Sequence, residues 1–175
     1  RAYLIASNHC SHLDPPFVGC GVVPKIHFFA KSELQKIPFI GWLIFRHLGS
    51  IPVKRGEADL KAIKAVINFL KNGDCVGFFP EGTRSLDGEL QEAKSGIGMI
   101  AYQSQVAILP VYIHGSFRAF PKGAKLFKPI KIHVYFGKPY VPTAYQEPKS
   151  REVYQLISDE TILKIKEIQQ QVRNG

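Results

Sequence analysis

The residues that could do chemistry gather near the start of the chain, in the stretch NHCSHLDPP over residues 8–16. It holds two histidines, an aspartate, a cysteine and a serine, which are side chains that group-transfer sites commonly use. His9 and His12 have no third ligand at a metal-binding spacing, which disfavours a zinc site. Cys10 adjoins His9 in sequence, and adjacent side chains diverge, so a cysteine nucleophile activated by that histidine is also disfavoured.

His9 and Asp14 are the strongest candidate pair. Their spacing of five suits neither one strand face nor an ideal helix face, but the side chains can meet if the chain turns between them. Pro15 and Pro16 indicate such a turn, because proline is tolerated in the first turn of a helix, and this predicts Asp14 at the N-cap. An aspartate there could hold the imidazole in one tautomer and stabilise its protonated form. A simple helix cap beside an unrelated histidine is the alternative on this spacing alone.

A second stretch, FPEGTRS over residues 79–85, follows a predicted buried strand. Gly82 would let backbone N–H groups approach an anion, and Arg84 could bind a phosphate through two hydrogen bonds. Alone, this stretch is equally consistent with a surface loop that exposes an arginine.

Together the two stretches carry a resemblance. NHCSHLD resembles the NHxSxxD box, and FPEGTRS the FPEGTRS box, of the glycerolipid acyltransferases, with the 1-acylglycerol-3-phosphate acyltransferases as the nearest branch. GSIPVKRG (49–56), with Arg55, and ILPVYI (108–113) resemble two further blocks in the family's order. AKSELQKIPFIG (30–41) resembles the segment between the first two blocks and puts Lys31 at a usually basic position.

The resemblance implies transfer of an acyl group from a thioester, on coenzyme A or acyl-carrier protein, to the free sn-2 hydroxyl of lysophosphatidate, giving phosphatidate. His9 would be the general base and Asp14 would orient it. The hydroxyl would attack the thioester directly, so that no nucleophile of the enzyme is required. The acyl donor is a co-substrate, and neither a cofactor nor a metal is implied. The implied substrate-binding residues are Lys31, Arg55, Glu81, Gly82, Thr83 and Arg84.

Several related activities would share these motifs, because the residues that choose the headgroup are not visible in them. The alternatives are an acyltransferase for another lysophospholipid, a transacylase between phospholipids, a thioester hydrolase, and a lipid-binding relative without turnover. A nucleic-acid-binding protein is disfavoured, since only the positive charge supports it and no helix-turn-helix, RNP-like or zinc pattern is present.

Charge and hydropathy point toward a membrane surface. With 23 Lys and Arg against 14 Asp and Glu, the formal net charge is +9, which favours anionic partners. No apolar run approaches the roughly 20 residues of a spanning helix. The apolar stretch 37–49 could be an acyl-chain groove, a membrane-dipping element or a core helix. The basic stretch 121–131 could face a membrane or the coenzyme's phosphates, or could be a solvated face.

We therefore expect a membrane-associated protein at the cytoplasmic face. The three cysteines contain no CxxC pair, which agrees with a reducing compartment. Members of the family usually carry hydrophobic or amphipathic helices before the first block, and the resemblance implies that this membrane-associating segment is missing here.

The elements that would position these residues alternate along the chain. Alternating strands and helices predict one α/β domain over residues 1–175, with a central mixed sheet flanked by helices, as in the glycerolipid acyltransferases. Pro52 places its strand at an edge or a strand end. The predicted strands lie at 2–7, 25–31, 48–55, 74–83, 106–115 and 130–140, and the helices begin near Asp14 and cover 58–72, 94–105 and 150–173.

Overall fold

The computed structural model describes residues 2–21, 26–31, 50–53 and 60–174. The strands are β1 (Tyr3–Ser7), β2 (Ile26–Lys31), β3 (Ile51–Val53), β4 (Cys75–Phe78), β5 (Ala107–His114) and β6 (His133–Phe136). The helices are α1 (Asp14–Cys20), α3 (Leu60–Lys71), α4 (Gly96–Ser104), α5 (Ser116–Ala119) and α6 (Arg151–Asn174), with a 3₁₀ turn η3 (Thr143–Gln146). The short α5 and η3 are the described elements that the sequence pattern did not predict.

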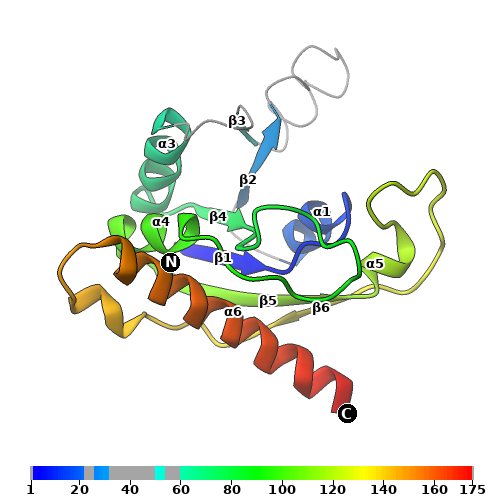
Figure 1. Ribbon diagram of the computed structural model, residues 1–175. Coiled ribbons are helices and arrows are strands. Elements are labelled where there is room, and N and C mark those ends of the chain that lie inside the picture. Colours follow the sequence, from blue (N-terminus) through cyan, green and yellow to red (C-terminus); the bar gives the residue numbers. More distant parts are fainter. Residues whose placement is uncertain (1, 22–25, 32–49, 54–59, 175) are drawn as a thin grey trace.

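These strands form one twisted sheet in the order β3-β2-β4-β1-β5-β6 (Figure 1). Strands β1 to β5 are parallel, and β6 pairs antiparallel with β5. The predicted α/β architecture with a mixed sheet is therefore confirmed, and so is the edge position of β3, the strand that contains Pro52. Because the parallel strands all end at one edge of the sheet, the loops after β1 and β4 are brought together there.

Strand β1 lies at the centre of the core. Leu4, Ile5 and Ala6 are almost completely buried, because helices cover both faces of the parallel sheet. The side chains of Leu4 and Ala6 point into a cluster shared with α3, α4 and α6. Ile5 points to the other face and packs in a cluster with Val18 of α1. This rigid central strand delivers the NHCSHLD stretch directly at its carboxyl end.

The buried faces of α3 and α6 are not made of large apolar side chains alone. In α3 the buried positions Ala62, Val66 and Leu70 face the core, while Ile63 and Ile67 beside them are only partly buried. In α6 the buried stripe includes Ser158 and Thr161, whose hydroxyls donate to backbone carbonyls of their own helix. Small hydroxyl residues can be buried there because their polar groups are satisfied within the helix.

None of the helices in the described residues has the length and apolar composition needed to cross a membrane. The apolar stretch 37–49 lies outside the described residues.

Gly98 explains why a glycine interrupts α4. A Cβ at this position would lie 1.8 Å from the backbone oxygen of Tyr154 and 2.8 Å from the hydroxyl of Ser158. The Gly98 N–H also donates to that hydroxyl at 3.1 Å. Helices α4 and α6 therefore pack backbone to backbone at this point, which only glycine permits. Gly96, two residues earlier, has room for a side chain, because a Cβ added there would make only an ordinary van der Waals contact with Phe78, at 3.7 Å.

We expect Gly98→Ala to destabilise the fold by about 2 to 3 kcal/mol, although alanine is the better helix former, because the clash involves backbone atoms that cannot rotate away. Thermal unfolding should show a Tm lower by roughly 5 to 10 °C. Gly96→Ala is the matched control and should leave the Tm unchanged or slightly raised. Equal Tm values for the two variants would contradict the close approach of α4 to α6.

Candidate active site

The two motif loops meet at the carboxyl edge of the sheet. The first leaves the end of β1 and leads into α1, and the second leaves the neighbouring β4, so the loops lie side by side (Figure 1). Two hydrogen bonds connect them directly at His9: its N–H donates to Oε1 of Glu81 at 2.7 Å, and its carbonyl accepts from the N–H of Ser85 at 2.7 Å. The backbone of His9 is thus held on both sides by the second motif.

The side chains of His9 and Asp14 are in contact. Nδ1 of His9 lies 2.9 Å from Oδ2 of Asp14, whose side chain is completely buried. The same oxygen accepts the backbone N–H groups of Cys10 and Ser11, each at 2.7 Å. Three N–H groups therefore converge on one oxygen of this carboxylate. The turn predicted between these two residues is present.

The predicted N-cap position of Asp14 is wrong by one residue. Helix α1 begins at Asp14, and Leu13 occupies the N-cap without a side-chain hydrogen bond. The physical reason is that the carboxylate turns back toward the loop of residues 9–11 and so does not cap the helix N–H groups ahead of it.

The orientation of the His9 ring follows from its neighbours. Because an ionised carboxylate can only accept, Nδ1 carries the proton, and Nε2 has its lone pair free for a reacting group. The ring stacks on Phe79 with a centroid distance of 3.9 Å and an interplanar angle of 16°. The side chain is 18% exposed, so it can be reached from outside the protein. The arrangement is suited to taking up and returning one proton at a fixed position.

Glu81 braces the second loop against the first. Its side chain is almost fully buried, and its two oxygens accept the N–H groups of His9 and Gln91, at 2.7 and 3.0 Å. Burial raises the pKa of this carboxyl to about 7, although both hydrogen bonds act in the opposite direction. With both oxygens engaged by the backbone, Glu81 fits the shaping of the loop better than direct contact with substrate.

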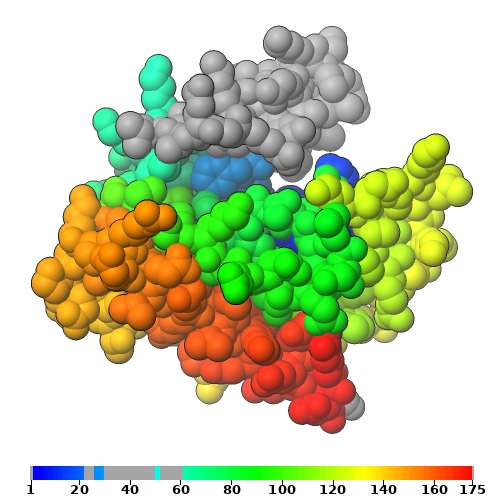
Figure 2. Space-filling view, viewed as in Figure 1, coloured from blue at the N-terminus to red at the C-terminus, as the bar shows by residue number. Residues whose placement is uncertain are grey.

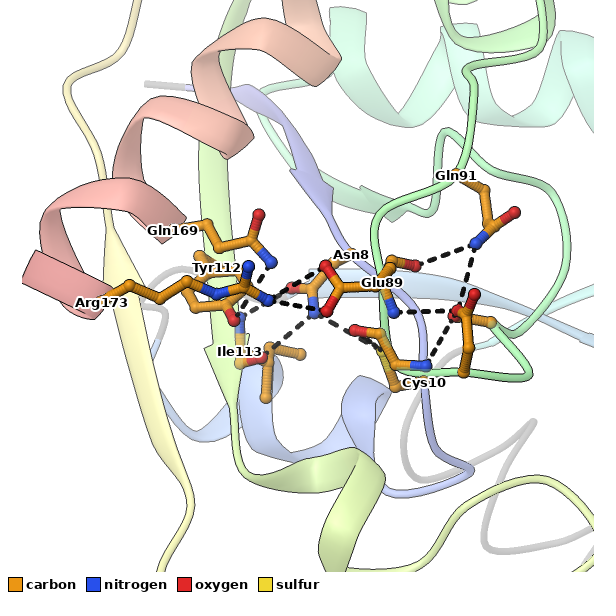
Figure 3. Close-up of polar contacts among 11 residues, drawn as sticks. Asn8, Cys10, Glu89, Gln91, Tyr112, Ile113, Gln169 and Arg173 are labelled. Atoms are coloured by element: carbon orange, nitrogen blue, oxygen red, sulfur yellow. Dashed lines mark hydrogen bonds and ion pairs between the residues drawn. The ribbon is translucent and has the colours of Figure 1, made fainter.

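Asn8 fixes the start of the first loop to β5. Its amide oxygen accepts the N–H of Ile113 at 2.7 Å, and its amide nitrogen donates to the carbonyl of Ile113 at 3.1 Å. Figure 3 shows Asn8 reaching toward Ile113 and Cys10. The side chain thereby copies the pairing of a peptide group and extends the β1–β5 ladder by one step. The sequence pattern did not assign Asn8 this function, because Ile113 is 105 residues away.

The neighbouring Cys10 and Ser11 do not suit nucleophilic attack. Burial is the main reason that the pKa of the Cys10 thiol is raised to about 12, and it therefore stays protonated near neutral pH. Ser11 is completely buried, and its hydroxyl oxygen accepts the N–H of Leu13 at 3.1 Å. Both side chains brace the loop.

The predicted anion-binding residues occupy different places. Gly82 and Thr83 are exposed at the loop surface, and Arg84 is half-buried beside them. Gly82 has a φ of 68°, a left-handed conformation that favours glycine. Lys31 is the last residue of β2. Arg55 lies outside the described residues.

Lys94 is a further cation at this loop. A Cβ added to Gly82 would lie 3.0 Å from Cδ and 3.4 Å from Nζ of Lys94, so the lysine side chain passes directly over the glycine. The N–H of Lys94 also donates to the carbonyl of Pro80 at 2.9 Å, which holds its backbone at the base of the loop. Nothing in the sequence separates Lys94 from the other lysines, because its position depends on the return of the chain after the loop.

The end of α6 is attached to the same region. Arg173 makes a two-pronged ion pair with Glu89, with oxygens 2.9 and 3.0 Å from Nη2 (Figure 3). Both side chains are more than half exposed, so we expect the pair to contribute little to overall stability and mainly to restrain the loop.

A second histidine–carboxylate pair lies elsewhere, at the start of β2. Nε2 of the buried His27 is 3.2 Å from Oδ2 of Asp74, and its ring stacks on Phe69 at 4.0 Å. Asp74 is 47 positions from His27 in the sequence, so only the fold brings the two side chains together. Across the described ranges, no group of three His, Cys, Asp or Glu side chains is placed to hold a metal ion.

The proteins of similar sequence that we compared with this chain are all acyltransferases. Residues 1–114 match the sequence profile of the acyltransferase family. The chain is 35% identical over 121 residues to the chloroplast 1-acyl-sn-glycerol-3-phosphate acyltransferase of Arabidopsis thaliana, covering 68% of this chain and 33% of that one. It is 30% identical over 168 residues to the 1-acyl-sn-glycerol-3-phosphate acyltransferase of Bacillus subtilis, covering 95% of this chain and 81% of the relative.

A solved structure shares the fold. The crystal structure of the 1-acyl-sn-glycerophosphate acyltransferase of Thermotoga maritima superposes with a TM-score of 0.78 at 32% identity, covering 97% of this chain and 66% of that chain. The chain thus spans about a third of the length of the chloroplast relative and about two thirds of this crystallised one.

The raised pKa of Glu81 predicts a pH-dependent stability. Since the folded-state pKa of about 7 lies above the ordinary value of 4.5, the folded protein binds this proton more tightly than the unfolded chain. The Glu81 contribution to the free energy of unfolding should therefore be largest below about pH 4.5 and fall by on the order of 3 kcal/mol as the pH rises through 7. The measurement is the free energy of unfolding, from chemical denaturation between pH 5 and 8, of the wild type and of Glu81→Gln. The difference between the two curves against pH is the Glu81 contribution. Parallel profiles would show that burial does not perturb this carboxyl.

Proposed function

The chain belongs to the acyltransferase family, and on that premise we propose that it transfers a fatty acyl group to the free sn-2 hydroxyl of lysophosphatidate, giving phosphatidate. The donor is an acyl thioester, carried by coenzyme A or acyl-carrier protein. The names of the relatives from Arabidopsis thaliana and Bacillus subtilis support this choice of acceptor, since both are called 1-acyl-sn-glycerol-3-phosphate acyltransferases.

The contact between His9 and the buried Asp14 is the observation that carries the proposal. An alcohol is a poor nucleophile until a base removes its proton during attack, and a neutral imidazole is well matched to this task near pH 7. The 2.9 Å contact from Nδ1 to the carboxylate leaves Nε2 as the base. Asp14 then stabilises the positive charge that the ring acquires.

The proposed reaction has two proton transfers at one atom. As the sn-2 hydroxyl oxygen attacks the thioester carbonyl carbon, its proton passes to Nε2 of His9. The tetrahedral intermediate collapses by breaking the carbon–sulfur bond, and the departing thiolate takes the proton back from Nε2. The imidazole returns to its starting state, and the products are the acylated phospholipid and the free thiol.

Direct attack, without an acyl-enzyme intermediate, is supported by the surroundings of His9. The Cys10 thiol has a pKa raised to about 12, and the buried Ser11 hydroxyl accepts a backbone hydrogen bond. The substrate itself therefore supplies the nucleophile.

The acceptor's phosphate needs cations near the loop of residues 81–84. We propose Arg84 as its main partner, because a guanidinium matches a phosphate through two parallel hydrogen bonds, with Lys94 close by over Gly82. Thr83 and the exposed backbone of the loop complete the surface for the anion. Lys31 and Arg55 stay as predicted further partners. The acceptor is a lipid, so we also propose that the protein acts at an anionic membrane surface, on the cytoplasmic face.

Replacing either member of the pair tests the base directly. We expect His9→Ala and Asp14→Asn each to lower kcat by roughly 10²-fold or more, and a cooperative thermal unfolding transition should show that each variant is still folded. The assay follows radiolabelled lysophosphatidate into phosphatidate, with acyl-coenzyme A and acyl-carrier protein as separate donors and with detergent micelles. His12→Ala is the matched control, since His12 is an exposed histidine in the same loop, and it should keep wild-type activity.

The outcomes separate the proposed function from its alternatives. Loss of phosphatidate with His9→Ala, and not with His12→Ala, supports both the base and the acceptor. Release of free fatty acid by the wild type would indicate a thioester hydrolase instead. Product from a different lysophospholipid alone would reassign the acceptor. Substantial activity of His9→Ala would overturn the mechanism.

The phosphate contact predicts a selective effect on acceptor affinity. We expect Arg84→Ala to raise the KM for lysophosphatidate about tenfold or more, because a charge-assisted hydrogen bond contributes about 1.5 to 3 kcal/mol, while the KM for the acyl donor changes little. Arg151→Ala removes the same charge from the exposed start of α6 and serves as the control. An equal rise in KM for donor and acceptor would mean that Arg84 holds the loop and does not contact the phosphate.

A further inference from the structure

We propose that the loop between α5 and β6, residues 120–132, is the surface by which this protein docks on an anionic lipid bilayer. We call this segment the basic loop. The inference rests on the proposed function for the location of the substrate in a membrane, and it adds which surface faces that membrane.

The charge of this region is strongly one-sided. From residue 116 to residue 146 the sequence holds six Lys or Arg residues and no Asp or Glu. Four of these cations are in the basic loop, and all four are exposed: Lys122, Lys125, Lys128 and Lys131. A segment without a single carboxylate has no internal partner for these charges, so it attracts an anionic surface.

Between these lysines the loop exposes two large apolar side chains. Leu126 is 81% exposed and is the most exposed large hydrophobic residue in the part of the chain that the structure describes. Phe127, its neighbour, is 54% exposed. Apolar side chains flanked by lysines are the pattern of segments that insert among lipid chains while their cations contact the headgroups.

The loop projects from the protein and is held in shape by its backbone. Figure 1 shows it extending past the carboxyl edge of the sheet, and Figure 2 shows the same segment as a protrusion at one side of the molecule. The N–H of Lys128 donates to the carbonyl of Ala119 at 2.9 Å and closes its base. A turn from Pro121 to Ala124, closed at 3.1 Å, has Gly123 at a φ of 88°, which suits the third position of a type II turn. The apolar tip of the loop, Leu126 and Phe127, is thus held exposed at the surface.

The basic loop is also joined to the candidate active site. A backbone bridge pairs Pro121 with Ser11, in the loop between His9 and Asp14. An open hollow of about 400 Å³ lies at this junction and is lined by Leu13 and Phe17 from the α1 side and by Phe120 and Phe127 from the basic loop. Docking through this loop would therefore bring the start of α1 to the bilayer surface. The apolar hollow would then lie between α1 and the lipid.

The combination favours a bilayer over a soluble anion. Four lysines alone could bind the phosphates of a coenzyme or a nucleic acid. The phosphates of a coenzyme offer no apolar surface, and a nucleic acid could stack a base on Phe127 but would leave the aliphatic Leu126 exposed, whereas a bilayer accepts apolar side chains and cations together.

Vesicle sedimentation tests the proposal with the whole chain. We expect the wild type to bind vesicles of phosphatidylcholine and phosphatidylglycerol, and to bind pure phosphatidylcholine vesicles far more weakly. Leu126→Ser combined with Phe127→Ser should weaken binding to the anionic vesicles about tenfold or more. Leu156→Ser combined with Leu163→Ser is the matched control, because these α6 leucines are 58% and 57% exposed, and it should bind like the wild type.

The charge contribution is measured separately. Lys125→Gln with Lys128→Gln should weaken binding to the anionic vesicles roughly 20-fold or more at low salt, at about fivefold per lysine. Lys149→Gln with Lys166→Gln removes the same charge from exposed positions outside the loop and should change binding much less.

Each outcome decides a different question. Normal vesicle binding by both loop variants would overturn the docking surface. A raised KM for acyl-coenzyme A, with vesicle binding retained, would reassign the lysines to the coenzyme, and retention on RNA in place of vesicles would reassign them to nucleic acid. In detergent micelles the loop variants should transfer acyl groups at wild-type rates. Vesicle binding by a wild type that makes no phosphatidate would uphold the docking surface and reject the proposed function.

Discussion

The buried carboxylate of Asp14 is the constraint on which the rest of the site depends. A carboxylate with no exposure to water needs hydrogen-bond donors, and Oδ2 has three, from His9, Cys10 and Ser11, whereas the buried Oδ1 has none among the described residues. Two of these donors are backbone groups, so the carboxylate determines the path of the loop as well as the orientation of the imidazole. The same interaction therefore forms the loop and fixes the imidazole in one orientation.

The loop of residues 79–85 holds the backbone of His9 in place on the side away from Asp14. Glu81 and Ser85 both bond to the backbone of His9, which joins two segments 72 or more positions apart in the chain. The carboxyl group of Glu81 is costly to ionise in its buried position, as its raised pKa of about 7 indicates. Glu81 pays this cost because its carboxyl group must be buried between the two loops in order to accept hydrogen bonds from both of their backbones. The two bonds from Glu81 and Ser85 hold the backbone of His9 in one position.

The sheet supplies the common base for these contacts. Parallel β1 and β4 end side by side, and the amide of Asn8 continues the ladder onto β5 beyond the last paired residues. Above this base, the loop of residues 81–84 and the basic loop emerge at the same edge (Figure 1). The cations of these loops, the imidazole of His9 and the apolar side chains of the basic loop are consequently gathered on one side of the molecule, an arrangement that fits the acceptor we propose.

The sequence by itself determined the strands and the longer helices and, together with the family resemblance, the central pair. Strand and helix periodicities, and the prolines after Asp14, act over a few residues, so the six strands and the turn from His9 to Asp14 were predictable. Only the tertiary structure decided that Glu81 is a brace, that Gly98 lets two helices touch and that Lys94 crosses Gly82. These three depend on atoms brought together by the fold. A residue type shows what a side chain can do, but its partners across the chain decide which of those interactions it makes.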